Sequence, residues 1–163
     1  MISFRLVRIT GVFFLFFVCL LVTAAAAQPV CLNVQTKSGR AHHRIAVGDE
    51  LYVTFPHSIY GSRVEEHFRV TSQGFQLVEL SYAEPRLVEF YGHESAANED
   101  GRWVVRKLGP ELTVLDLHVT PDSRIAVTFG AEKLTVTHNE LANGRARLAL
   151  SACPRSNHGR RSR

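Results

Sequence analysis

Residues 51–70 read LYVTFPHSIYGSRVEEHFRV, and this stretch decides the fold. Apolar side chains alternate with polar ones on both sides of a short segment, Tyr60-Gly61-Ser62. Successive side chains of a β-strand point to opposite faces, so a period of two is typical of a strand. The stretch therefore predicts two antiparallel strands joined by a turn, with His57 and Ser58 at the end of the first strand.

The same period continues along the chain. Further short alternating runs lie at residues 31–34, 75–80, 103–105, 115–119, 125–129, 134–136 and 146–150. Turn-forming residues separate them, and regular short strands of this kind are typical of antiparallel sheets. We therefore expect one all-β domain, either a single antiparallel β-sandwich or a partly open β-barrel-like domain that follows an N-terminal signal peptide.

Some segments are expected to connect strands. Asn143-Gly144 predicts a tight hairpin turn, because both residue types tolerate positive φ. His42-His43 is expected in an exposed turn, and residues 82–101 are expected to form a long loop. No segment shows a helix with both a cap and a 3.6-residue period.

The first 27 residues resemble a secretory signal peptide. Arg5 and Arg8 precede an apolar run at residues 12–22, and small residues at Ala25 and Ala27 fit a cleavage site before Gln28. The apolar run is about half the roughly 20 residues that a membrane-spanning helix needs. We therefore divide the chain into a signal peptide (1–27), a β domain (28–154) and a basic tail (155–163). We expect an exported protein, periplasmic or extracellular. After cleavage of the signal peptide, we expect no stable membrane span.

The basic charge of the chain lies mainly at its ends. Two arginines lie in the signal peptide and four in the last nine residues, so 13 of the 19 basic side chains remain in residues 28–154, against all 15 acidic ones. A nucleic-acid-binding domain usually has a clear basic excess. We therefore expect no nucleic-acid partner.

The body contains two cysteines, Cys31 and Cys153, one near each end. In an oxidising compartment an even pair favours a disulfide. Neither a histidine nor an acid lies near Cys153 in sequence, which weakens the alternative of a reactive thiol or a metal ligand. We therefore predict a disulfide that ties the first strand to the last.

One strand carries an acid on its apolar face. Within residues 64–70, Glu66 shares a face with Val64 and Phe68, whereas Glu65 belongs to a row of charges on the other face. A buried carboxylate is costly unless it finds a partner or its pKa rises. Glu66 is therefore the most informative side chain of this hairpin.

Three interpretations of the hairpin remain open. In the first, Glu66 accepts hydrogen bonds from Ser58, His57 or backbone amides and fixes the turn. In the second, a pocket binds a small polar or anionic ligand, and its candidate residues are His57, Ser58, Tyr60, Glu65, Glu66 and Tyr91. In the third, His57 and Glu66, with His67 or His93, form the site of a secreted hydrolase or metal-binding enzyme. The common catalytic and cofactor motifs are absent from the sequence, so we assign no catalytic residue, metal ligand or cofactor.

The hairpin also resembles a known signature. His57-Ser58, Val64-Glu65-Glu66 and Phe68 with Val70 are similar to the motif of an exported family, domain of unknown function 1850. The stretches at 31–34 and 47–51 also resemble that family, and the likeness covers roughly residues 31–105. The resemblance implies a small exported protein associated with tripartite ATP-independent (TRAP) transporters of the TAXI type, whose permease takes up organic anions.

These observations together favour a non-enzymatic accessory or ligand-binding module of such a transporter. Its expected partners are the TRAP permease, the solute-binding protein or a small organic anion. The alternatives are the secreted hydrolase or metal-binding enzyme that uses His57 and Glu66, and a structural envelope protein without a ligand.

Overall fold

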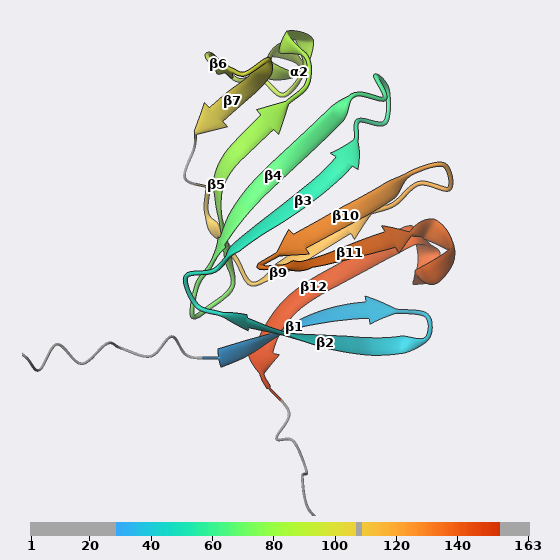
Figure 1. The fold of residues 1–163 in the computed structure, drawn as a ribbon. Helices are drawn as coiled ribbons and strands as arrows, with labels where there is room; N and C mark the ends of the chain where they lie inside the picture. The colour runs from blue at the N-terminus through green and yellow to red at the C-terminus, as the bar shows by residue number, and fades with distance from the viewer. Residues whose placement is uncertain (1–28, 107–108, 154–163) are drawn as a thin grey trace, which may run out of the picture.

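Two antiparallel β-sheets make up most of the protein (Figure 1). The structure, a computed structural model, describes residues 29–106 and 109–153. The signal peptide and the basic tail that the sequence predicts therefore lie outside the described residues. The sheets are not closed into a barrel, so the all-β prediction is confirmed in its sandwich-like form.

The smaller sheet contains four strands in the order β2-β1-β12-β9. Their bounds are Pro29–Thr36 for β1, Gly39–Ala46 for β2, Val114–His118 for β9 and Arg145–Ala152 for β12. The first and last strands of the domain thus lie side by side. Cys31 in β1 forms a disulfide with Cys153, directly after β12, and their Cα atoms are 4.8 Å apart. The predicted disulfide is confirmed.

The larger sheet contains eight strands, seven of them in the order β11-β10-β3-β4-β5-β7-β6, with β8 beside β5. Their bounds are Glu50–Pro56 for β3, Arg63–Val70 for β4, Phe75–Tyr82 for β5, Ala97–Glu99 for β6, Arg102–Arg106 for β7, Glu111–Leu112 for β8, Arg124–Phe129 for β10 and Glu132–Thr137 for β11. The hairpin at residues 51–70 supplies two adjacent strands of this sheet, as predicted, with Pro56 opposite Arg63.

The main hydrophobic core lies between the two sheets. Leu32 and Leu148 from the smaller sheet and Leu51, Val53 and Val127 from the larger one are all buried in it. Each of these side chains occupies the inward position of an alternating strand, which explains why the period of two in the sequence locates the core.

The larger sheet extends beyond the smaller one, and a second hydrophobic cluster lies on this extension. A short helix, α2 (Pro85–Phe90), covers it and buries Leu87 and Val88 against the strands (Figure 1). Proline at the first helical positions is favourable because its missing N–H has no partner in a helix. No helix in residues 29–106 and 109–153 has the length and apolar character needed to cross a membrane.

Three local predictions were wrong. His42-His43 lies in strand β2 and not in a turn. The expected loop at 82–101 contains α2 and β6. Asn143-Gly144 belongs to a 3-10 turn, η3 (Ala142–Gly144), that follows a second such turn, η2 (His138–Glu140), after β11.

The error at Asn143-Gly144 has a simple physical reason. Both residues do have positive φ, 55° and 66°, as a type I′ hairpin turn requires. However, the strand before this segment pairs with β10, and the strand after it pairs with β1 and β9. The turn therefore carries the chain from one sheet to the other, and local turn chemistry does not show which strands pair.

Candidate functional site

His57 lies at the tip of the β3–β4 hairpin, at the end of the larger sheet that α2 covers. Its backbone N–H donates to the carbonyl oxygen of Ser62, and its own carbonyl accepts from the N–H of Gly61, both at 2.8 Å. Gly61 has φ of 68°, a conformation that favours glycine. This tight turn folds over the histidine, which is only 4% exposed.

The backbone of the turn also orients the imidazole of His57. Its Nδ1 atom accepts from the N–H groups of Ile59 and Tyr60, each at 3.3 Å. A neutral imidazole carries one proton, so an accepting Nδ1 places that proton on Nε2. The Nε2–H group is therefore the hydrogen-bond donor of this ring.

Three aromatic rings surround His57. Tyr60 stacks on it with ring centroids 5.1 Å apart, and the edge-on rings of Phe90 and Tyr91 lie at 4.7 and 5.6 Å. Tyr60 comes from the same turn, whereas the other two come from the last residue of α2 and the residue after it. Edge-to-face and offset stacked pairs are favourable arrangements of aromatic rings. We call these four residues the His57 cluster.

A second pair of polar rings continues from the His57 cluster toward the sheet. Tyr82, which is buried, stacks on Tyr91 with centroids 5.4 Å apart. The hydroxyl of Tyr82 and Nε2 of His93 are hydrogen-bonded at 2.8 Å. Burial is the main cause that raises the pKa of the Tyr82 phenol, and the Tyr91 and Glu66 charges add to it. Tyr82 is therefore a neutral hydroxyl at physiological pH.

Glu66 lies on the same side of the sheet as these rings. Burial raises the pKa of its carboxyl, and no ion pair or hydrogen bond to that carboxyl is formed within the described residues. The pKa of Tyr91 is raised mainly by burial, and the negative charge of Glu66 raises it further. The carboxyl therefore faces the two tyrosines as a poorly solvated acid, and its neutral form is favoured more than in water.

The other two predicted residues of the hairpin are placed differently. Ser58 is exposed on the turn. Glu65 lies on the outer face of the larger sheet, where it accepts a hydrogen bond from Thr54 and forms ion pairs with Arg63 and Arg102. The structure therefore brings His57, Tyr60 and Tyr91 together and separates Glu65 from them.

The outer face of the larger sheet also carries the row of charges that the sequence predicts. His67 Nε2 lies 2.6 Å from a carboxylate oxygen of Glu50, and Arg69 lies 3.2 Å from its other oxygen. Arg106 likewise contacts Glu79 and Glu99. Basic and acidic side chains on this face are paired with one another, so their charges largely offset each other.

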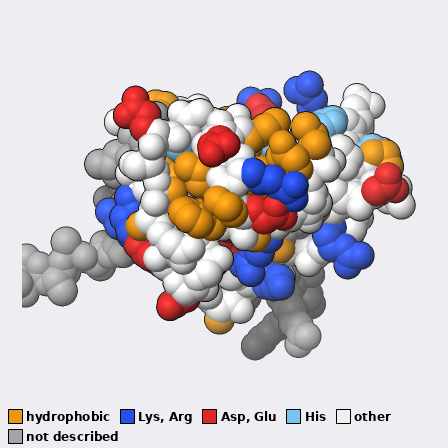
Figure 2. All heavy atoms as spheres, turned by 90° about the horizontal axis from the view of Figure 1, so that it is seen from above, with side chains coloured by type: hydrophobic (Ala, Val, Ile, Leu, Met, Phe, Trp, Pro, Cys, Tyr) orange, Lys and Arg blue, Asp and Glu red, His pale blue; other side chains and the backbone are white. Residues whose placement is uncertain are grey.

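The surface above the His57 cluster is unusually apolar. Ile59, Phe90 and Tyr91 are 68%, 49% and 43% exposed, although all three are large hydrophobic side chains. Figure 2 shows hydrophobic side chains gathered on this end of the molecule, between basic and acidic ones. The guanidinium of Arg86 lies 4.2 Å from the centre of the Tyr60 ring, and it also forms an ion pair with Glu84. The surface is thus an apolar patch with a charged rim.

Ile59, Phe90 and Arg86 belong to this site but were not among its predicted residues. Ile59 lies in the hairpin, whereas Phe90 and Arg86 lie in α2, a helix of six residues. A helix of that length is too short for a 3.6-residue period to be recognised. The proline at its start was the one signal in the sequence that indicated it.

No group of three or more histidine, cysteine or acidic side chains is arranged to hold a metal ion in the part of the chain that the structure describes. Comparison with family models, with curated proteins and with solved structures finds no match to this chain. The site therefore has to be interpreted from its own chemistry.

Proposed function

We propose that this protein is an exported, non-enzymatic accessory of a TAXI-type TRAP transporter, and that it binds a transporter protein through the apolar patch over the His57 cluster. The observation that carries the proposal is that three large hydrophobic side chains, Ile59, Phe90 and Tyr91, are exposed at one end of the molecule. The sequence supports export and the resemblance supports the transporter. The disulfide fits an oxidising compartment.

An exposed group of large apolar side chains with a polar rim is typical of a protein-binding surface. Tyrosine and arginine are common among the residues that contribute most to such interfaces. The buried ring of His57 beneath the patch contacts the rings of Tyr60 and Phe90, so these side chains are already ordered. Ordered side chains lose less entropy on binding.

The partner that we propose is the permease or the solute-binding protein of the transporter. A photo-activatable crosslinking amino acid at position 59 of the exported chain, co-expressed with its transporter, tests this. The matched control carries the same amino acid at Asp122, an exposed position in the turn between β9 and β10. We expect an adduct with one of the two transporter proteins from position 59 and none from position 122.

Equal adducts from both positions, or adducts with neither transporter protein, would overturn the proposal. Metal analysis of the purified protein separates it from the enzyme alternative. A stoichiometric metal that is lost in His57→Ala would favour a metal-binding enzyme, and transport of solute that does not depend on the protein would favour a structural envelope role.

A further inference from the structure

The outer face of the smaller sheet carries a second surface, at the opposite end of the molecule from α2 (Figure 1). Its strands alternate, so side chains such as Leu32 and Leu148 enter the core while their neighbours point outward. We call the exposed outward arginine, histidine and acidic residues the arginine face, and they are Arg40, His42, Arg44, Asp116, His118, Arg145 and Arg147.

The strand register brings four arginines from two strands far apart in sequence, β2 and β12, onto this one face. Arg40 in β2 lies opposite Gln35 in β1, which lies opposite Arg147 in β12. Arg145 lies opposite His118 in β9. Neighbouring strands are about 4.8 Å apart, so Arg40 and Arg147 leave the sheet about 10 Å from each other.

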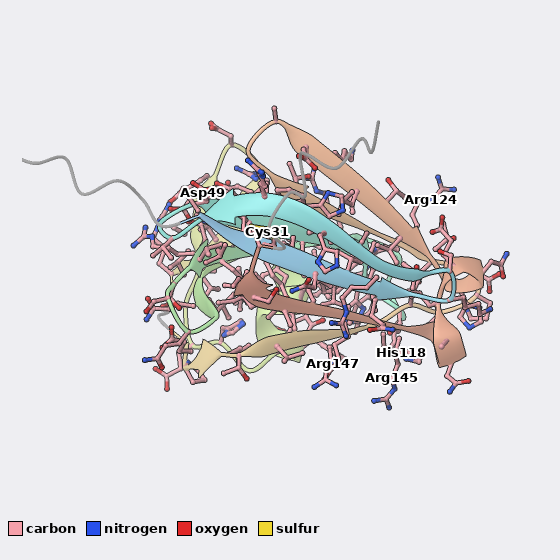
Figure 3. The ribbon with its side chains drawn as sticks, turned by 90° about the horizontal axis from the view of Figure 1, so that it is seen from below. Cys31, Asp49, His118, Arg124, Arg145 and Arg147 are labelled. Atoms are coloured by element: carbon pink, nitrogen blue, oxygen red, sulfur yellow. A yellow bond between two sulfur atoms is a disulfide. The ribbon has the colours of Figure 1, made fainter. Side chains whose placement is uncertain are left out.

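Figure 3 shows Arg145, Arg147 and His118 side by side, with side chains that project away from the ribbon. All three are exposed. The guanidinium groups of this face are therefore accessible to a partner.

The positive charge of the arginine face is largely uncompensated. Its one acid in the described residues is Asp116, whose carboxylate lies 3.8 Å from Arg147. The other three arginines form no ion pair with a described residue. On the larger sheet, by contrast, Arg63, Arg69 and Arg106 each contact a glutamate. The body of the chain is nearly neutral, but the arginines of the smaller sheet are mostly unpaired whereas these arginines of the larger sheet are paired.

From this asymmetry we infer that the arginine face binds the surface of a membrane that contains anionic phospholipid. Guanidinium groups bind phosphate oxygens in a bidentate way, and basic residues are attracted to anionic lipid. The face is a sheet surface whose arginines lie on the edge strand β2 and the inner strand β12, which matches an extended layer of headgroups. It presents no exposed phenylalanine, tyrosine or tryptophan ring on which bases of a single strand would stack. It also has no helix that would enter a DNA groove.

Vesicle co-sedimentation of the full exported chain tests this inference. The vesicles contain either phosphatidylcholine alone or phosphatidylcholine with an equal amount of phosphatidylglycerol. The variant is Arg44→Gln with Arg145→Gln, since neither arginine has an acidic partner in the described residues. The unaltered protein and all variants have the same residues 155–163, so the arginines of this segment do not bias the comparison.

We expect binding to the anionic vesicles only, and binding that weakens as salt is added. Each basic residue near an anionic surface strengthens binding about fivefold, so the double variant should bind about 25-fold more weakly. The matched control is Arg124→Gln with Lys133→Gln, which removes the same charge from two exposed positions of the larger sheet. It should bind like the unaltered protein, within about twofold.

Equal losses in the two double variants would overturn the inference, because net charge alone would then explain binding. No sedimentation with anionic vesicles would overturn it as well. Tighter binding to a short DNA duplex than to the vesicles would assign the face to nucleic acid instead. None of these results affects the crosslinking test at position 59, so the membrane inference and the proposed function fail independently.

Discussion

The imidazole of His57 stacks on the ring of Tyr60 at a centroid distance of 5.1 Å and also accepts a hydrogen bond from the backbone N–H of Tyr60. One short turn therefore holds the histidine through both its ring face and its Nδ1 atom. This arrangement explains how a histidine becomes almost completely buried at the tip of a hairpin.

Replacement of His57 by alanine should destabilise the protein strongly. His57→Ala removes the ring contacts with Tyr60 and Phe90 and leaves two partly buried N–H groups without their acceptor. We expect the free energy of unfolding to fall by about 2–4 kcal/mol, as measured by urea denaturation. Ser58→Ala, an exposed neighbour, should change it by less than about 0.5 kcal/mol. Equal effects of both substitutions would contradict this account.

The disulfide should contribute a large part of the stability. Cys31 and Cys153 are separated by 122 residues in sequence. A bond that closes so long a loop restricts the unfolded chain, and the entropic account gives about 4–5 kcal/mol. Denaturation of the wild-type protein with and without reductant should show this loss, and the Cys31→Ser, Cys153→Ser double variant should show the same loss without sensitivity to reductant. A wild-type curve that reductant does not shift would contradict the prediction.

Glu66 should make the protein less stable as the pH rises. Burial raises the pKa of its carboxyl in the folded chain above the ordinary value of 4.5. The folded state then keeps a proton that the unfolded state has lost, so the stabilisation is complete below the unfolded pKa and is lost as the pH rises through the folded one.

Glu66→Gln mimics the neutral carboxyl and should remove this dependence. We expect the variant to be more stable than the wild type at about pH 7 and close to it at about pH 4. Thermal melts of both proteins across this range provide the measurement. Glu89→Gln, a change at an exposed acid of α2, is the control and should leave the slope in place. If the slope persists in Glu66→Gln, another group causes it.

Gly74 should not tolerate a side chain. A Cβ atom at this position would overlap the carbonyl oxygen of Leu112, in the short strand that pairs with the start of β5. Backbone cannot yield as a flexible side chain can, so Gly74→Ala should cost about 1–3 kcal/mol in a urea melt. Ser72→Ala, exposed in the same turn, should be nearly neutral, and an unchanged Gly74→Ala protein would show that β8 adjusts without cost.

The sequence predicted most of the strands because most of them have one buried face. Val53 and Phe68 are buried at the alternate positions where the period of two places them. Strand β2 was not predicted because it has almost no buried face. In Gly39–Ala46, Ile45 is the one fully buried residue, so this edge strand has almost no apolar alternation to recognise.

The candidate site was predicted in part. His57, Tyr60 and Glu66 lie within one hairpin, so local sequence indicates their proximity. Phe90 comes from a short helix that we did not predict from the sequence, and its contact with His57 depends on how α2 lies over the larger sheet. The burial of Glu66 followed from the strand period, whereas its lack of a described partner is a tertiary property.

The sequence by itself determined the all-β class, most of the strand positions and the pair of cysteines that form the disulfide, because side-chain alternation and residue type are local properties. Only the tertiary structure decided which strands pair and which charges share a surface. Residues 28–154 contain nearly equal numbers of basic and acidic side chains, yet strand register gathers Arg40 and Arg147 on the smaller sheet and pairs Arg69 with Glu50 on the larger one. The physical reason is that register joins residues about a hundred positions apart, and neither composition nor periodicity records such a pairing.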